Sequence, residues 1–212
     1  MTSERDRFDR AIVAFDAANA RDPNRERVGG VERPRELVYA ERMSAMQQRY
    51  APDASEIVRL AVRAQHIERW KRPRSDFPMD RIGYLTWRKR LYRFHAEVAG
   101  GLLRDAGYDD ATIGRVGALL RKENIKSDPE MQLLEDVVGL VFLESYLAGF
   151  VATHDGYDVA KFNDILAKTG RKMSARGRAA ALSLIDLPDA LVPVVRAALE
   201  SAGAGNGNRS ED

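Results

Sequence analysis

The 212-residue sequence contains no cysteine, which excludes disulfide bonds and thiolate metal ligands and agrees with a reducing compartment. It also lacks any charge-free run of about twenty apolar residues, so we expect no transmembrane helix. The first eleven residues, MTSERDRFDRA, are charged and have no apolar centre, so they do not resemble a secretory signal. We therefore expect a cytoplasmic protein with no membrane partner.

Neither sign of charge dominates, because 34 lysines and arginines nearly balance 32 aspartates and glutamates. The composition therefore indicates no general affinity for polyanions. No stretch alternates with a period of two, whereas apolar residues recur at helical spacing, so the sequence predicts an all-α fold. The connector 22–34 is rich in turn residues, and Asp53 followed by Glu56 resembles a helix capping box. The expected helices cover residues 5–21, 35–50, 53–70, 83–107, 109–123, 131–150, 159–168, 175–184 and 188–201.

The stretch 131–150, MQLLEDVVGLVFLESYLAGF, is long enough for five helical turns and is apolar on nearly every face, so we expect most of it to be buried. Asp136 is the exception, because it lies on the same helical face as Leu133 and Leu140. An ionised carboxylate in an apolar seam is unfavourable unless a cation, a metal or hydrogen-bond donors meet it. Two explanations stay open: Asp136 holds a metal ion, or it caps a neighbouring helix or pairs with an arginine.

Three further polar side chains, Glu123, His95 and His66, lie at helical spacing from apolar residues. A histidine at a helix edge is more often a hydrogen-bonded spacer than a ligand, and Glu123 at a helix end can simply reach solvent. The combination is more informative, because two imidazoles and two carboxylates on four helices could converge on one divalent cation (Mn, Fe, Zn or Mg). Helical bundles form such sites where inward side chains of facing helices meet.

Basic residues gather between positions 69 and 93, where the only carboxylates are Asp76 and Asp80, and again between positions 168 and 178. Arginine suits phosphate recognition, because guanidinium offers a planar fork of donors. Each of these side chains alone is most simply a solvated cation, but the whole cluster in a nearly neutral protein favours an anionic partner. The candidate substrate-binding residues are Arg69, Trp70, Arg74, Arg88, Lys122 and Lys172.

One motif is similar to those of an unrelated enzyme class. The segment 172–176, KMSAR, resembles the KMSKS loop of class I aminoacyl-tRNA synthetases, and residues 65–67 are faintly similar to their HIGH element. Those enzymes need a parallel sheet of the dinucleotide-binding type beneath both motifs. Because we expect no strands, we give this resemblance little weight.

Three segments resemble the HD-domain phosphohydrolases: RLAVRAQHIERW, FHAEVAGGLLRDAGY and ALLRKENIKSDPEMQLLEDVVGLVFLE. That family carries an HD doublet, two later histidines and a final aspartate in a helix. The resemblance implies that His66 takes the place of the doublet's histidine and His95 that of the next one. It likewise implies that Glu123 takes the place of the later histidine and Asp136 that of the final aspartate.

The sequence departs from this pattern at the doublet, where Ile67 replaces the aspartate, and no histidine precedes His66, which leaves Glu41 as the only nearby substitute. The phrases AQHIERW, PRSDFPMDRIGYLTWR, LRKE, LEDVVGLVFLE and KTGRKMS more closely resemble a bacterial and fungal family described as domain of unknown function 4202. This likeness covers nearly the whole chain before the tail. We interpret residues 1–202 as a single compact HD-like domain, with a core at about 35–154, a helical extension at 158–202 and a disordered tail at 203–212.

The HD resemblance implies metal-dependent hydrolysis of a nucleotide or another phosphate ester. The divalent metal would be held by His66, His95, Asp136 and Glu41, with Glu123 as general base or further ligand. The rival function is that of a non-catalytic HD-like module that binds a nucleotide or RNA, which the loss of the doublet's aspartate favours. A purely structural partner protein is the third possibility, and the basic clusters make it less attractive.

Overall fold

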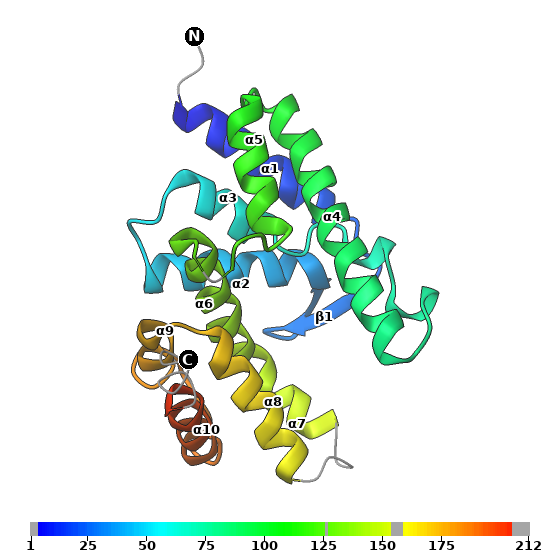
Figure 1. Ribbon diagram of the computed structural model, residues 1–212. Coiled ribbons are helices and arrows are strands. Elements are labelled where there is room, and N and C mark those ends of the chain that lie inside the picture. Colours follow the sequence, from blue (N-terminus) through cyan, green and yellow to red (C-terminus); the bar gives the residue numbers. More distant parts are fainter. Residues whose placement is uncertain (1–3, 126, 154–158, 205–212) are drawn as a thin grey trace. The chain divides into compact units, whose positions relative to one another are not determined.

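The computed structural model describes residues 4–125, 127–153 and 159–204, and it confirms the all-α prediction (Figure 1). The chain forms two compact units, residues 1–131 and 132–212, each described here by itself. The expected boundary, between a core ending at 154 and an extension beginning at 158, thus differs from the observed division at 131/132. The predicted disordered tail lies outside the described residues from position 205 onward. Every helix within the described ranges is too short or too polar to span a bilayer.

The first unit contains most of the elements. In chain order these are α1 (Glu4–Asn19), the strands β1 (Arg25–Val28) and β2 (Val31–Pro34), α2 (Arg35–Tyr50), α3 (Glu56–Ala64), the short turns η1 (Arg69–Lys71) and η2 (Arg74–Asp76), α4 (Arg81–Asp105) and α5 (Asp110–Leu120). The helix α6 (Pro129–Val141) begins in this unit and continues into the second.

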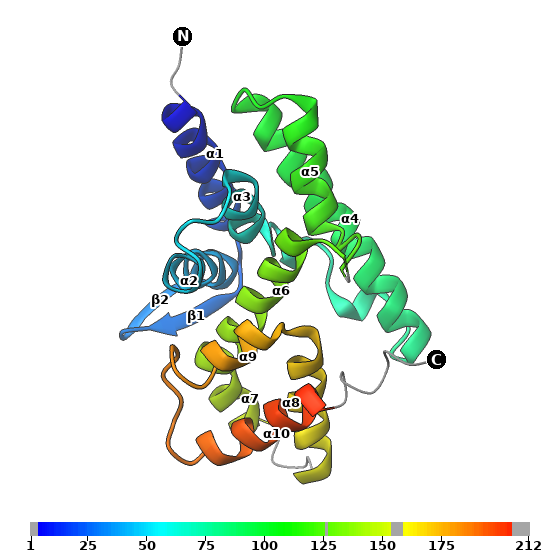
Figure 2. The ribbon, with the colours of Figure 1, turned by 60° about the vertical axis from the view of Figure 1, so that its left-hand side comes forward.

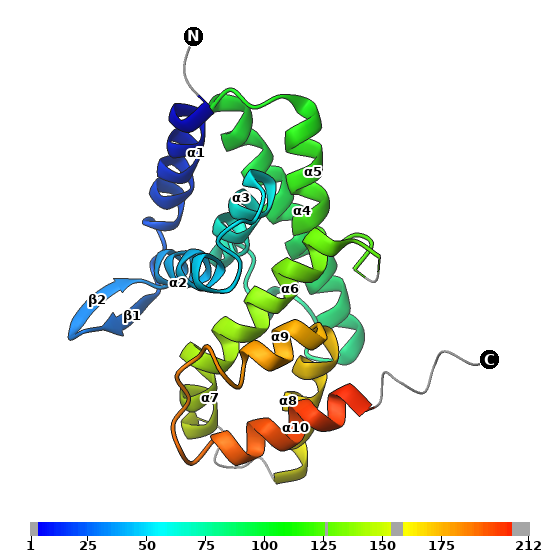
Figure 3. The same cartoon turned by 90° about the vertical axis from the view of Figure 1, so that its left-hand side faces the viewer.

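The helix α3 is the centre of the first unit, because it packs against α1, α2 and α5 (Figure 3). Its sequence, EIVRLAVRA, puts the charged residues Glu56, Arg59 and Arg63 on one face and apolar residues on the rest, so a broad apolar face is buried. The helix begins two residues later than the capping-box pattern predicts, because the Ser55 hydroxyl accepts the Val58 amide at 3.2 Å and serves as the N-cap in place of Asp53.

A short antiparallel hairpin, β1 with β2, lies beside α2 (Figure 2) and was not expected from the sequence. Each strand has four residues and keeps much of its surface exposed, so neither shows the apolar alternation of a core strand. Gly29 and Gly30 both have positive φ values, 57° and 86°, as the tightest hairpin turns require. The Gly-Gly pair is therefore the sequence feature that indicates this hairpin, whereas apolar periodicity does not indicate it.

The helices α4 and α5 lie side by side in opposite directions, as Figures 1 and 3 both show. Aspartates cap both helices, because the Asp80 carboxylate accepts the Gly83 amide and the Asp109 carboxylate accepts the Thr112 amide, each at 2.7 Å. The buried stripe of α4 runs from Trp87 to Leu103 at helical spacing.

The second unit contains the rest of α6 and five further elements: the π-helical turn η3 (Phe142–Tyr146), α7 (Leu147–Thr153), α8 (Val159–Lys172), α9 (Ala175–Ala180) and α10 (Val192–Ala204). The predicted five-turn helix is thus interrupted by a π-helical turn after Val141. The helices α8 and α10 pack closely, because Gly170 has no side chain: a Cβ there would lie 2.9 Å from the Ala202 Cβ.

Candidate functional site

Six polar or aromatic side chains from four segments of the first unit form the candidate site. They come from α2, from the turn after α3, from α4 and from the turn after α5. We call this group the histidine cluster: Glu36, Tyr39, His66, Arg69, His95 and Lys122.

The imidazole of His66 has partners on three sides. Its ring stacks on Tyr39, with 4.0 Å between ring centroids and an interplanar angle of 13°. Its Nε2 lies 3.0 Å from the Arg69 Nη1, and because a guanidinium only donates, Nε2 must accept. The proton therefore belongs on Nδ1, which faces the Glu36 Oε2 at 3.4 Å.

The imidazole of His95 is 1% exposed, and its ring centroid lies 6.0 Å from that of His66. Its Nδ1 lies 2.8 Å from the Ile67 carbonyl oxygen, which only accepts, so Nδ1 carries the proton. The lone pair of Nε2 is buried and has no hydrogen-bond partner within the described part of the chain. Buried acceptors are normally satisfied, so this nitrogen needs a donor from a bound molecule or from water.

The electrostatics of the cluster favour an anion. Burial, together with the charges of Arg69 and Lys122, holds the pKa of His66 and the pKa of His95 well below their ordinary range, so both rings are neutral. Burial also raises the pKa of Glu36 to about 7, although Arg69 and Arg35 oppose this shift. Near neutral pH, fixed positive charges therefore face two neutral rings and a partly protonated carboxyl group. The same field works against a divalent cation at these imidazoles.

Glu36 was not among the predicted site residues, although its position carried a signal. It lies on one helical face with Ala40, Met43 and Gln47, which are all buried, and Glu41 does not. The remote residue Asp22 caps this end of α2, because its carboxylate accepts the Glu36 amide at 3.0 Å.

Two strained backbone positions flank the cluster. Glu68, directly before Arg69, has a φ of 50°, and Lys122 has a φ of 59°, in the left-handed region that disfavours residues other than glycine. Lys122 ends α5 in a Schellman arrangement, in which its own amide donates to Leu119 and the Glu123 amide donates to Ala118. Backbone strain of this kind is often found at functional sites.

The two predicted carboxylates near this site are engaged elsewhere. Glu41 pairs with both terminal nitrogens of Arg33, at 2.9 and 2.7 Å, so the carboxylate beside His66 is Glu36 instead. The prediction that Glu123 faces inward is wrong: its side chain is 47% exposed and pairs with Arg121. The helical spacing does not reach position 123, because α5 ends at Leu120 and the backbone turns left-handed.

In the second unit, Asp136 is 2% exposed, which confirms that it faces inward. Its carboxylate accepts the Ser174 amide at 2.7 Å, the Ser174 hydroxyl at 2.5 Å and the Gln132 side-chain amide at 3.0 Å. Gly177 allows this approach, since a Cβ there would lie 2.6 Å from the Asp136 Cγ. This arrangement matches the capping alternative, because Ser174 is the N-cap of α9. Lys172, also a predicted substrate-binding residue, is exposed just before this cap.

Of the other predicted substrate-binding residues, Arg69 and Lys122 belong to the histidine cluster. Arg74 donates to backbone carbonyls of the loop that precedes α4. Arg88 donates to the Tyr92 hydroxyl and also lies over the Tyr84 ring. Trp70 is half-buried on η1.

The predicted metal site is not assembled as expected. Within the ranges described, no three His, Asp or Glu side chains are grouped so that they could hold a metal ion. At His66 the lone pair that a metal would need is used by Arg69. Of the two described histidines, only His95 keeps the arrangement of a metal-ligating histidine, with Nδ1 donating to a carbonyl and Nε2 without a partner among the described residues. The metal assignment of these residues stays a prediction.

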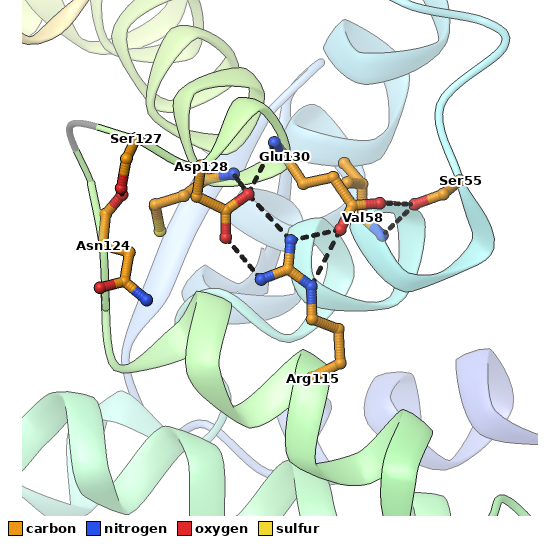
Figure 4. Close-up of polar contacts among 8 residues, drawn as sticks. Ser55, Val58, Arg115, Asn124, Ser127, Asp128 and Glu130 are labelled. Carbon is orange, nitrogen blue, oxygen red and sulfur yellow. Dashed lines mark hydrogen bonds and ion pairs between the residues drawn. The ribbon is translucent and has the colours of Figure 1, made fainter.

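A second polar group of the first unit, the Arg115 network, consists of Ser55, Arg115, Asp128 and Glu130 (Figure 4). The guanidinium of Arg115 lies between two carboxylates, bonding Asp128 at 2.5 and 2.8 Å and Glu130 at 2.5 and 3.0 Å. Ser55 contacts Glu130 at 2.5 Å, and Asp128 also accepts two amides in the first turn of α6. Arg115 holds the pKa of Asp128 down at about 2.

Comparison with known proteins gives one match. The family described as Domain of unknown function (DUF4202) matches residues 9–195. No curated protein and no solved structure matches the chain.

Proposed function

Because the chain belongs to the DUF4202 family, whose description assigns no activity, we propose a function from the histidine cluster itself. The protein binds a small phosphorylated molecule, such as a nucleotide, at this cluster. One observation carries the proposal: the buried Nε2 of His95 has no partner among the described residues and lies within an electropositive group of side chains.

The charge of the cluster suits a phosphate group. Arg69 and Lys122 both act on the two neutral rings, and the partial protonation of Glu36 near neutral pH reduces the opposing charge. A phosphate provides acceptor oxygens for both cations, and guanidinium matches its geometry. The His66 ring occupies only one of the guanidinium N–H groups of Arg69, and the remaining donors of Arg69 would contact the phosphate.

The need of the His95 Nε2 for a hydrogen-bond donor further restricts which phosphorylated molecules fit the cluster. A fully deprotonated phosphate monoester, a dianion, would offer only acceptors, whereas Nε2 needs a donor. A phosphate monoester, whose second pKa is about 6, keeps an O–H in part of its population at neutral pH, and a sugar hydroxyl would serve equally. The cluster therefore favours a phosphorylated metabolite that carries a hydroxyl group over a simple polyanion.

Calorimetric titration with adenosine monophosphate and with inorganic phosphate tests the proposal. The Arg69→Gln variant should weaken binding by at least about tenfold, because it removes a charge-assisted hydrogen bond. Arg104→Gln is the matched control, since Arg104 lies on α4 in an exposed pair with Asp110 and should leave the affinity unchanged. The proposal fails if neither ligand binds or if both variants bind like the wild type.

A second candidate function, hydrolysis of the bound phosphate ester, is favoured by the Glu36–His66 pair. A carboxyl group with a pKa of about 7, placed 3.4 Å from an imidazole nitrogen, is suited to proton transfer near neutral pH. The HD-domain resemblance adds a divalent metal to this candidate, and His95 is the residue best prepared to ligate it.

Release of phosphate from nucleotides, measured with and without Mn, Fe, Zn or Mg, tests this second candidate. Glu36→Gln should reduce the rate by at least about a hundredfold, the effect of losing a general acid or base. Glu41→Gln, on the same helix but paired with Arg33, should not reduce it. If no phosphate is released under any of these conditions, the binding function stands alone.

A further inference from the structure

Four exposed apolar side chains follow one another closely in sequence at the start of α4. Met79 is 80% exposed, Ile82 77%, Leu85 47% and Tyr84 42%. They make up half of the exposed large apolar residues in the described part of the chain, yet they fall within seven consecutive positions. Isolated exposed apolar residues are ordinary, whereas a cluster of them marks a surface that meets another body. We call Met79, Ile82, Tyr84 and Leu85 the apolar tip.

The backbone that displays the apolar tip is firmly built. Arg74 donates to the carbonyl oxygens of Phe77 at 2.9 Å and Pro78 at 2.6 Å, which shapes the loop. Asp80 caps the helix, and a Cβ at Gly83 would lie only 2.1 Å from the Pro78 carbonyl oxygen, so the loop packs tightly on the first turn of α4. The apolar side chains are therefore held outward by the fold. Figure 1 shows this end of α4 lying away from α1 and α5.

Charged side chains of both signs lie beside the apolar tip. A pocket of about 810 Å³ there is lined by Ile82, two phenylalanines, three arginines and three carboxylates. Two of these arginines lie over the phenylalanine rings, Arg72 over Phe94 and Arg90 over Phe77. The exposed cations of residues 72–97 are Arg72, Arg81, Lys89, Arg90 and Arg93, and the exposed carboxylates are Asp76, Asp80 and Glu97. The positive side chains thus outnumber the negative ones around the tip.

We propose that the apolar tip inserts into the surface of an anionic lipid bilayer, with the surrounding cations pairing with lipid headgroups. Side chains exposed by 77–80% protrude from the surface, and a deformable bilayer can bury them without a matching cavity. Basic residues beside a membrane add to the binding of anionic lipid. This mode of binding needs no spanning segment, so it is compatible with the lack of one, on which the expectation of no membrane partner rested.

The chemistry of the apolar tip distinguishes a bilayer from a nucleic acid. RNA would gain from the arginines and from stacking on Tyr84, but Met79 and Ile82 offer no π face to a base. These two aliphatic side chains are the most exposed members of the tip, and burial in an apolar phase is what favours them. The inference does not depend on the histidine cluster.

Co-sedimentation of the full chain with vesicles tests the inference. Vesicles of phosphatidylcholine mixed with phosphatidylserine should bind the protein, and phosphatidylcholine alone should bind it weakly. Met79→Ser and Ile82→Ser should each weaken binding by about tenfold, from the lost burial of one aliphatic side chain. Lys89→Glu should weaken it by about fivefold or more. Val13→Ser is the matched control, because Val13 is 67% exposed on α1, outside the apolar tip.

Three outcomes would overturn the inference. The first is equal binding to both kinds of vesicle, which would remove the role of the cations. The second is unchanged binding by the Met79 and Ile82 variants while the protein stays folded. The third is a change of the protein from dimer to monomer in those variants without vesicles, which would assign the apolar tip to a second copy of the chain.

Discussion

The Arg115 network and the histidine cluster both gather charged side chains within the first unit, but their charges are balanced differently. In the network, one guanidinium meets two carboxylates, which also accept a hydroxyl and helix amides. In the cluster, Arg69 and Lys122 face neutral imidazoles, a carboxyl group with a raised pKa and a buried acceptor without a partner.

This difference agrees with a structural role for the network and with the binding role that we propose for the cluster. A fully satisfied polar network rigidifies the parts of the fold that it joins, and here it joins α5 with the starts of α3 and α6. A partly satisfied group is locally unfavourable and persists where function requires it. Substitutions in the two groups should therefore change stability in opposite directions.

The largest effect should come from Glu36→Gln, which we expect to stabilise the fold by about 3 kcal/mol near pH 8. The pKa of Glu36 is about 7 in the folded protein, above the 4.5 of an unperturbed glutamate. The folded state therefore binds more protons between these values, so stability is full below about pH 4.5 and falls as pH rises through about 7. Glutamine does not titrate and removes this loss. Chemical unfolding at several pH values measures the difference.

Two comparisons sharpen this result. His66 and His95 act in the opposite sense, because their lowered pKa values make stability fall as pH drops below about 6.5. Glu36→Gln keeps the loss of stability that the two histidines cause at acid pH but removes the loss that Glu36 causes at higher pH. The stability of this variant should therefore rise with pH up to about 6.5. Glu41→Gln should give no gain at any pH, since Glu41 is only partly buried and is paired with Arg33. A loss of stability near pH 8 in Glu36→Gln would show that its carboxylate is satisfied.

In the Arg115 network, Arg115→Met should instead lower the free energy of unfolding by about 2 kcal/mol near pH 7. The reason is that two carboxylates lose a charge-assisted partner. The folded pKa of Asp128, about 2, lies below its ordinary 3.8, so its contribution is present above about 3.8 and is lost as pH falls through about 2. The variant should therefore differ most from the wild type near neutral pH and least near pH 2. Urea unfolding at both values measures this.

The control for Arg115→Met is Arg121→Met, whose exposed pair with Glu123 should change stability by only about 0.5 kcal/mol or less. An equal effect of the two substitutions would mean that the Arg115 network behaves as an ordinary surface ion pair. The structural role of the Arg115 network, with which we contrast the histidine cluster, would then be unsupported.

Local sequence patterns predicted the elements that depend on local rules. The helix over residues 35–50 and the inward positions of His95 and Asp136 follow from apolar spacing, and the structure confirms them. The same rule failed at Glu123, because a left-handed residue ended the helix before the spacing could apply. Glu36 was not predicted as a site residue, although the same spacing puts it on one helical face with the buried Met43.

The partners of these side chains could not be predicted, because they come from distant parts of the chain. Asp22 caps α2 from 14 positions away, and Ser174 meets Asp136 across 38 positions. Neither pairing leaves a periodic signal. The role of Arg74 is different: it braces its own loop, but a basic residue beside prolines looks the same whether it binds a phosphate or a carbonyl.

The smallest effect should come from two glycine substitutions in the turn after α5. Lys122 and Asn124 both have left-handed backbones, with φ values of 59° and 54°, so glycine relieves strain at each position. We expect Lys122→Gly to stabilise the fold by about 1 kcal/mol or less, and Asn124→Gly by still less, because asparagine tolerates this conformation. Thermal unfolding measures both changes.

The two variants should differ in ligand binding. Lys122 contributes to the positive field at His66 and His95, whereas Asn124 is an exposed residue in the same turn. Lys122→Gly should therefore weaken phosphate binding by about tenfold, the equivalent of one charge-assisted contact, while Asn124→Gly should leave it unchanged. If Lys122→Gly raises stability and weakens phosphate binding, the strained lysine serves ligand binding and not the stability of the turn. If both variants bind equally well, the strain at Lys122 belongs to the helix end alone, and the histidine cluster loses one of its two cations.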